Sequence, residues 1–158
     1  MAEYRRSRNI ESSFKDFIIE QLETDGWNGI RTELSFTDVY LGKTPCILIE
    51  EPETQMPKRL EIGNSVFIKY PIVNIRIFAT GEGQRKDLKD WLIDSLESGI
   101  DYFEYTIGSG QVITKSLAGR IEIMQVLEDR KELVNVENLN IKDRNRHKFS
   151  FKCHVSKI

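Results

Sequence analysis

The chain has 158 residues, of which 39% are hydrophobic and 30% are charged, and its formal net charge at pH 7 is -2. This balance is typical of one globular domain and excludes disorder along the whole chain. A net charge near zero excludes a global field that would draw the protein onto DNA, although it leaves room for a local basic patch. No apolar stretch approaches the roughly 20 residues of a membrane-spanning helix, so no membrane partner is expected.

The N-terminal residues 1–8 are polar and basic, and no apolar segment of the signal-peptide kind follows them. We expect a flexible basic arm there and a single α+β domain over residues 9–158. Cys46 and Cys153 each lie in an apolar or alternating run, where a small buried side chain is expected. Such a pair fits a reducing cytoplasm better than a disulfide.

The first periodic segment predicts a helix that packs on a sheet. Its apolar residues recur at helical spacing and are Ile10, Phe14, Phe17, Ile18 and Leu22. Gly26 is placed to end the helix or to begin the turn after it. Alternation over residues 30–36 and the apolar run 46–49 then predict two strands.

The segment 50–59 combines two prolines with several charges, which is typical of an exposed loop or a hairpin tip. We expect it to contact a neighbouring subunit or another partner protein, because loops carry function more often than scaffold elements do, and a mobile surface hairpin is the alternative. Apolar side chains among charges are a common interface composition. The candidate interface residues here are Glu51, Glu53, Met56, Lys58 and Leu60.

A long strand is predicted over residues 65–79, where Pro71 indicates a bulge or an edge position. A helix follows over about residues 84–98. Gly81 and Gly83 lie between strand and helix, as in a dinucleotide-binding fingerprint, but Lys86 stands where the third glycine would be. A turn that starts the helix is therefore the favoured interpretation.

The remainder of the chain is strand-like. Aromatic residues mark 100–107, a glycine-rich turn follows at 108–110, and apolar residues recur over 120–127 and 133–141. Residues 147–155 alternate cleanly, with Phe149, Phe151, Cys153 and Val155 on the inward face. The order helix, strands, helix, strands predicts an α+β fold, with a mostly antiparallel or mixed sheet flanked by two helices.

Basic residues gather in the polar turn before this last strand. Lys142, Arg144 and Arg146 are further candidates for a subunit or partner interface. A solvated turn is the simplest interpretation. Weak contact with DNA or with an acidic protein is the more specific alternative.

No residues in the sequence form a recognisable catalytic, cofactor-binding or metal site. The two histidines, His147 and His154, are seven residues apart on one predicted strand and so should face opposite sides. No metal-binding motif is found. Glu61 and Lys69 offer a nuclease-like acid–lysine pair, which random expectation also supplies in a chain this rich in charges. We expect no cofactor and no enzymatic activity.

Several segments together carry a family resemblance. They are ESSFKDFIIEQL (11–22), PCILIE (45–50), VFIKYPIVNIRIFA (66–79), KDLKDWLIDSL (86–96) and KFSFKCHV (148–155). In this order they resemble the tail terminator proteins of long-tailed bacteriophages, also called tail-completion or head-to-tail joining proteins. The resemblance spans most of the chain, rests on pattern and not on signature residues, and leaves residues 104–146 as extra length over compact relatives.

The resemblance implies a virion structural protein, assembled in the host cytoplasm, that forms a ring of usually six copies at the top of the tail. This ring would stack on the last ring of tail tube protein, end tube growth and meet the head-connector or neck proteins. DNA would pass through the lumen without specific recognition. We therefore expect a lumen that is acidic or neutral, because inward basic side chains would hold phosphates.

Three alternatives remain open at this point. The chain could be another neck or tail-tube component, a small metal-dependent DNA-processing enzyme, or an interaction domain of a cellular complex. A closed ring favours the tail terminator interpretation, whereas a monomer with nuclease activity favours the enzyme.

Overall fold

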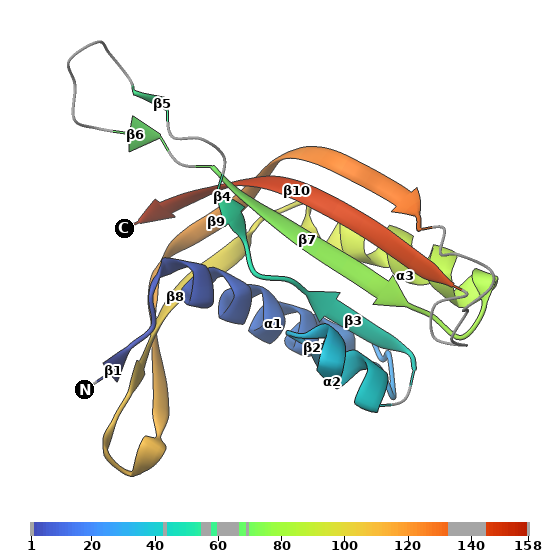
Figure 1. Ribbon diagram of the computed structural model, residues 1–158, viewed down its shortest axis with the longest axis horizontal. Coiled ribbons are helices and arrows are strands. Elements are labelled where there is room, and N and C mark those ends of the chain that lie inside the picture. Colours follow the sequence, from blue (N-terminus) through green and yellow to red (C-terminus); the bar gives the residue numbers. More distant parts are fainter. Residues whose placement is uncertain are drawn as a thin grey trace.

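The computed structural model describes residues 2–42, 44–54, 58–59, 67–68, 70–132 and 145–157. These residues form a curled mixed sheet with three α-helices (Figure 1). The predicted α+β fold class is thereby confirmed, and one short helix adds to the two that were expected.

The elements follow one another in a simple order. The helices are α1 (Arg6–Thr24), α2 (Phe36–Leu41) and α3 (Glu82–Leu96), and a 3-10 turn, η1, covers Ser109–Gln111. The strands are β1 (Ala2–Glu3), β2 (Arg31–Glu33), β3 (Cys46–Ile49), β4 (Glu53–Thr54), β5 (Lys58–Arg59), β6 (Phe67–Ile68), β7 (Pro71–Phe78), β8 (Ile100–Ile107), β9 (Ile113–Lys131) and β10 (Arg146–Lys157).

The main sheet has the strand order β1-β8-β9-β10-β7-β3-β2, with β4 also paired to β7. The β2–β3 pair is parallel, and the other described pairs are antiparallel. Strands β5 and β6 pair separately. The antiparallel β10 at the centre of the sheet confirms the strand predicted over residues 147–155, with Phe149, Phe151 and Cys153 buried as expected.

Both long helices cover the same face of the sheet and share one hydrophobic core with it. Their fully buried apolar residues lie at helical spacing: Ile10, Phe14, Ile18 and Leu22 in α1, and Leu88, Leu92 and Leu96 in α3. Phe17, which the periodicity placed with them, is only partly buried at the margin of this core. Within the described residues, no helix is both long and apolar enough to cross a membrane.

Helix α2 covers the opposite face, where Val39, Cys46, Leu48 and Phe78 form a second small core. The alternation over residues 30–36 predicted a strand that included Phe36. The prediction is wrong at Phe36, because the strand ends at Glu33. The Ser35 hydroxyl accepts a hydrogen bond from the Asp38 N–H and caps a helix that begins at Phe36. A local side-chain cap thus ends the strand early.

Residues 2–8, expected to form a flexible basic arm, take part in regular structure. Strand β1 pairs with the end of β8, and Tyr4 donates its N–H to the Tyr105 carbonyl at 3.0 Å. The Arg8 guanidinium lies 3.6 Å from the centre of the Tyr4 ring. Helix α1 begins at Arg6, so these basic residues belong to its first turn.

The 50–59 segment also contains regular structure. Pro52 is buried, and β4 extends along β7 from Ile72 to Pro71. Pro71 is the first residue of β7, a position where a proline is tolerated although it has no backbone N–H to donate to a neighbouring strand. The run predicted over residues 133–141 lies outside the described residues.

Candidate functional site

Strand β9 is the longest strand described, and only a short part of it is paired with another strand on both sides. Strand β8 pairs with residues 113–121, whereas β10 pairs with residues 119–131. In the described structure, residues 113–118 therefore have no partner on the β10 side. We call this the hairpin edge. Residues 122–131 have no described partner on the β8 side, and we call this the distal edge.

Contacts on the other side of β8 reveal which backbone groups the hairpin edge presents. Phe103 and Tyr105 donate their N–H groups to side chains of α1, and so turn away from β9. In an antiparallel ladder, directly opposite residues turn either both toward or both away from each other. Leu117 and Lys115, which lie opposite them, must direct their N–H and C=O groups to the hairpin edge.

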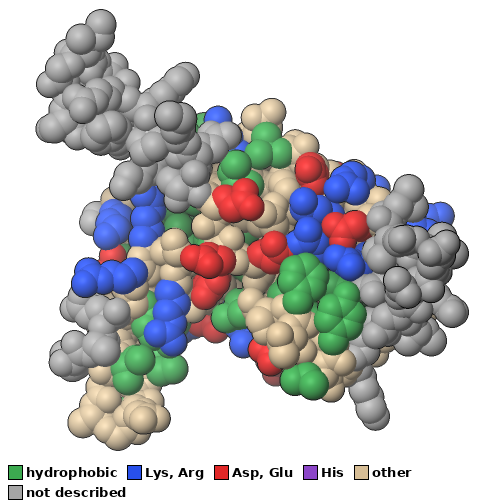
Figure 2. Space-filling model, viewed as in Figure 1, with side chains coloured by type: hydrophobic (Ala, Val, Ile, Leu, Met, Phe, Trp, Pro, Cys, Tyr) green, Lys and Arg blue, Asp and Glu red, His purple; other side chains and the backbone are tan. Residues whose placement is uncertain are grey.

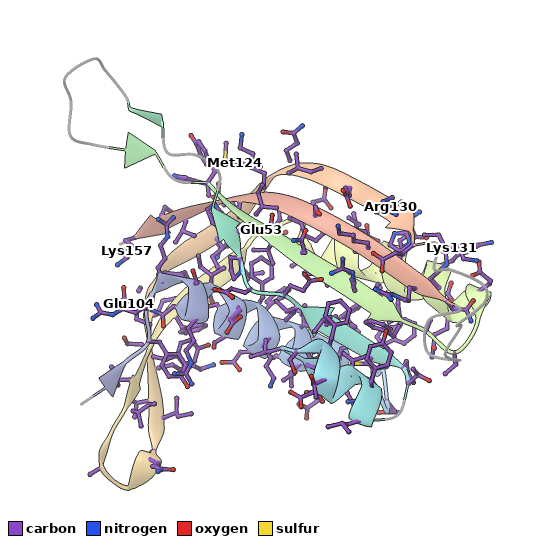
Figure 3. All side chains as sticks on the ribbon, viewed as in Figure 1. Glu53, Glu104, Met124, Arg130, Lys131 and Lys157 are labelled. Carbon is purple, nitrogen blue, oxygen red and sulfur yellow. The ribbon has the colours of Figure 1, made fainter. Side chains whose placement is uncertain are left out.

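Exposed apolar side chains gather on the same strand. Six large ones, each between 40% and 60% exposed, belong to β9 or the turn before it: Val112, Ile113, Leu117, Met124, Val126 and Leu127. Figure 3 shows Met124 and Arg130 on the part of β9 that runs along the rim of the sheet. Single exposed apolar residues are ordinary, but six along one hairpin and strand indicate a contact surface.

Three bulges shape this strand. Ala118 is the extra residue opposite β8, and Met124 and Leu127 are extra residues opposite β10, so none of the three is paired with a residue of that neighbouring strand. Each extra residue lies in β9, so this strand bends more than its neighbours and gains twist. Bulges also break a long edge into short pieces, which limits unspecific pairing with other proteins.

The outer edge of β8, by contrast, is closed by α1. The Ser13 hydroxyl accepts the N–H of Phe103 at 3.0 Å and donates to the carbonyl of Asn9 at 2.7 Å. The Asn9 side-chain oxygen accepts the N–H of Tyr105 at 3.1 Å. Both polar side chains are buried. These bonds satisfy edge donors that would otherwise attract another strand.

Sequence reasoning missed Asn9 and Ser13, although the signal was present. They stand four residues apart on the face of α1 that also carries Ile10 and Phe14. Polar residues at helical spacing within a buried face indicate that the opposing surface offers polar groups, because buried polar atoms need partners. An uncapped sheet edge is the usual source of such groups.

The base of the β8–β9 hairpin is held against α1 by Asp16. Its carboxylate accepts the Tyr105 hydroxyl at 2.6 Å and the Lys115 ammonium at 3.4 Å. Burial and this carboxylate raise the pKa of Tyr105 well above its ordinary value. An open cavity of about 410 Å³ lies beside these groups, between α1 and the hairpin. A cavity that is open to this degree is unlike an enclosed ligand site.

Arg146 lies in a charged cluster on the sheet face that α2 partly covers. Arg76 pairs with Glu50 and Glu132, and Arg146 also pairs with Glu132. The Arg146 guanidinium is 5.0 Å from the centre of the Phe78 ring, and its side chain is 11% exposed. Figure 2 shows acidic and basic side chains interleaved beside the apolar side chains in this region. Arg146 thus contributes contacts within the subunit.

The other predicted interface residues have different positions. Glu51 and Glu53 are exposed, and Glu53 lies in β4 beside Ile72. Lys58 lies in β5, paired with Ile68, and its side chain is outside the described part. The remaining candidates lie outside the described residues altogether: Met56, Leu60, Lys142 and Arg144.

The two histidines face opposite sides of β10, as predicted. His154 is exposed, whereas His147 is 2% exposed and lies between two charged partners. Its Nδ1 is 2.7 Å from Nη1 of Arg85, and its Nε2 is 2.6 Å from Asp129. Both ring nitrogens are therefore engaged by side chains of the same subunit.

No group of three or more metal-ligating side chains occurs among the residues that the structure describes. Glu61 and Lys69, the acid–lysine pair of the nuclease alternative, lie outside those residues. No protein-family model matches the chain, and no curated protein matches it significantly.

Proposed function

We propose that this chain is a virion structural subunit that assembles into a closed ring at the top of a phage tail. The ring ends tail-tube growth and joins the tail to the head connector. One observation carries the assembly part of this proposal: α1 closes the outer edge of β8, while the hairpin edge and the distal edge of β9 have no strand partner in the described structure and carry exposed apolar side chains.

A long open strand is a liability for a protein that acts alone. Unpaired N–H and C=O groups recruit other chains, and natural proteins cover or block such edges. This chain blocks one edge with Asn9 and Ser13, so a partner that covers the two β9 edges left unpaired in the described structure is the best explanation for them. Two different open surfaces on one subunit suit a head-to-tail contact, which produces a ring when the rotation closes.

The assignment to a phage tail rests on the resemblance of sequence pattern. The fold supports it in one respect, because the segments that carry the resemblance fold as regular elements. Residues 11–22 lie within α1 and residues 86–96 lie within α3. Residues 148–155 lie within β10, and most of residues 66–79 belongs to β7.

The proposed partners are further copies of this chain, the tail tube protein and the head-connector or neck proteins. DNA passes through the lumen, which we propose is acidic or neutral. The engagement of Arg146 with Glu132 inside the subunit supports this view, because a guanidinium paired in this way is less able to hold phosphates.

Removing the gene from the phage that encodes it tests this proposal. A terminator ring limits tube growth, so particles without it should have overlong tails and unattached heads. Wild-type protein and Leu41→Lys should restore joined tails, because Leu41 is an exposed apolar residue of α2, away from β9. Met124→Lys combined with Leu127→Lys should not restore them. Joined tails of normal length in the deletion would contradict the proposal.

A further inference from the structure

We propose that neighbouring copies join by strand addition: the hairpin edge of one copy pairs with the distal edge of the next. One sheet then continues from subunit to subunit around the ring. This inference rests on the proposed function, because it names the contact that holds the ring together.

The positions of the two edges favour this pairing over a symmetric dimer. They belong to one strand but open on opposite sides of it, the hairpin edge toward β10 and the distal edge toward β8. Pairing two distal edges would make a closed dimer and leave both hairpin edges uncovered. Pairing unlike edges covers both on every copy and repeats around a ring.

Both edges present backbone groups that can form the new ladder. On the hairpin edge these groups belong to Lys115 and Leu117. Beside the distal edge, Glu132 donates its N–H to the Arg146 carbonyl at 3.0 Å, so these two residues form a hydrogen-bonded pair. Hydrogen-bonded and non-hydrogen-bonded pairs alternate along an antiparallel ladder, so the next pair, Lys131 with His147, is not hydrogen-bonded. Lys131 and Asp129 therefore direct their N–H and C=O groups outward.

The side chains of the two edges also complement each other. Ile113 and Leu117 are exposed on the hairpin edge, and Met124, Val126 and Leu127 are exposed on the distal edge. Lys115 is the sole charged residue of segment 113–118. On the distal edge, Glu122 has no ion-pair partner among the described residues, whereas Asp129 is held by its hydrogen bond with His147. The ion pair between Lys115 and Asp16 is exposed, so Lys115 can pair with Glu122 of the neighbouring copy in its place at little cost in free energy.

The hairpin is placed to reach a neighbour. Figure 1 shows the tip of the β8–β9 hairpin projecting beyond the rest of the sheet and away from the distal part of β9. The edge of β8 cannot accept this hairpin in its place, because Asn9 and Ser13 already occupy its donors. The bulges at Met124 and Leu127 restrict pairing to short stretches, which suits a short hairpin strand.

Cross-linking between two variants tests this contact. Ser116→Cys puts a thiol on the hairpin edge, and Gln125→Cys puts one on the distal edge; both positions are exposed. The natural Cys46 and Cys153 are fully buried and do not compete. With different affinity tags on the two variants, a short bismaleimide should link one Ser116→Cys copy to one Gln125→Cys copy. Leu41→Cys, mixed with either variant, is the matched control and should stay unlinked.

Two results would overturn the inference. Links between two Gln125→Cys copies would show a symmetric contact, and the absence of mixed links would show that the edges do not meet. The native mass of the unsubstituted chain distinguishes a failure of this contact from a failure of the proposed function. A ring without mixed links would contradict the strand-addition contact and leave the proposed function standing. A monomer without links would contradict both.

Discussion

The guanidinium of Arg85 lies 2.7 Å from Nδ1 of His147 and ties the first turn of α3 to the start of β10. A guanidinium can only donate, so Nδ1 accepts and the ring proton resides on Nε2. Nε2 in turn donates to Asp129 at 2.6 Å, while Glu82 pairs with both Arg85 and Lys131. A neutral histidine thus links three segments of the fold.

This arrangement predicts a pH-dependent stability. Burial lowers the pKa of His147, the Arg85 charge adds to this shift, and Asp129 opposes it. Below about pH 6.5 the unfolded chain binds a proton that the folded chain resists, so stability falls as the pH decreases. Above that pH the contribution is fully present.

Urea unfolding between about pH 5 and 7.5 measures this effect. His147→Gln should flatten the dependence of the unfolding free energy on pH, whereas His154→Gln, at the exposed histidine, should keep the wild-type slope. An unchanged slope in His147→Gln would show that the proton uptake occurs elsewhere.

Ser13→Ala should reveal the closed edge of β8. The substitution leaves the partly buried Phe103 N–H without its acceptor, so we expect a loss of about 1–3 kcal/mol in unfolding free energy. Ser12→Ala, one residue away and not fully buried, should cost less than about 0.5 kcal/mol. Equal costs would mean that the hydroxyl of Ser13 does not protect the strand.

The core of α1 predicts an unequal response from its two phenylalanines. Phe14 is 0% exposed, so Phe14→Ala should destabilise the fold by about 3–5 kcal/mol. Phe17 is partly buried at the margin, so Phe17→Ala should cost less than about 3 kcal/mol. Chemical denaturation of both variants gives the comparison, and a larger loss in Phe17→Ala would contradict the described packing.

The two cysteines should be inert in the native protein. Both are fully buried thiols, and burial raises the pKa of the Cys153 thiol to about 12. Because the thiolate is the reactive form, a thiol reagent should label neither residue until the chain unfolds. Labelling counted by mass, with and without urea, checks this. Rapid native labelling would place a cysteine at the surface.

The fold was largely accessible from the sequence, because its long elements have strong hydrophobic periodicity. Strand β10 and helix α3 follow their patterns closely. Helix α2 was missed because it spans a single capped segment, in which Ser35 overrides the alternation that precedes it. Residues 2–3 pair through backbone groups, which leave no side-chain signature.

The candidate surface was less accessible. Which edges of a sheet stay open depends on strand order and register, and neither can be read from a hydrophobic pattern. The sequence did indicate apolar residues over 120–127, but not that Met124 and Leu127 lie at bulges and are exposed. The charged candidates were chosen from loop and turn composition, which does not indicate that Arg146 pairs with Glu132 inside the subunit.

The most direct test of the central claim is the native mass of the purified chain over a range of concentrations. The account predicts one closed assembly with a fixed number of copies, which Met124→Lys combined with Leu127→Lys converts to folded monomers, while Leu41→Lys leaves it intact. A wild-type chain that stays monomeric at every concentration, or that grows into open polymers without a limiting size, would contradict it.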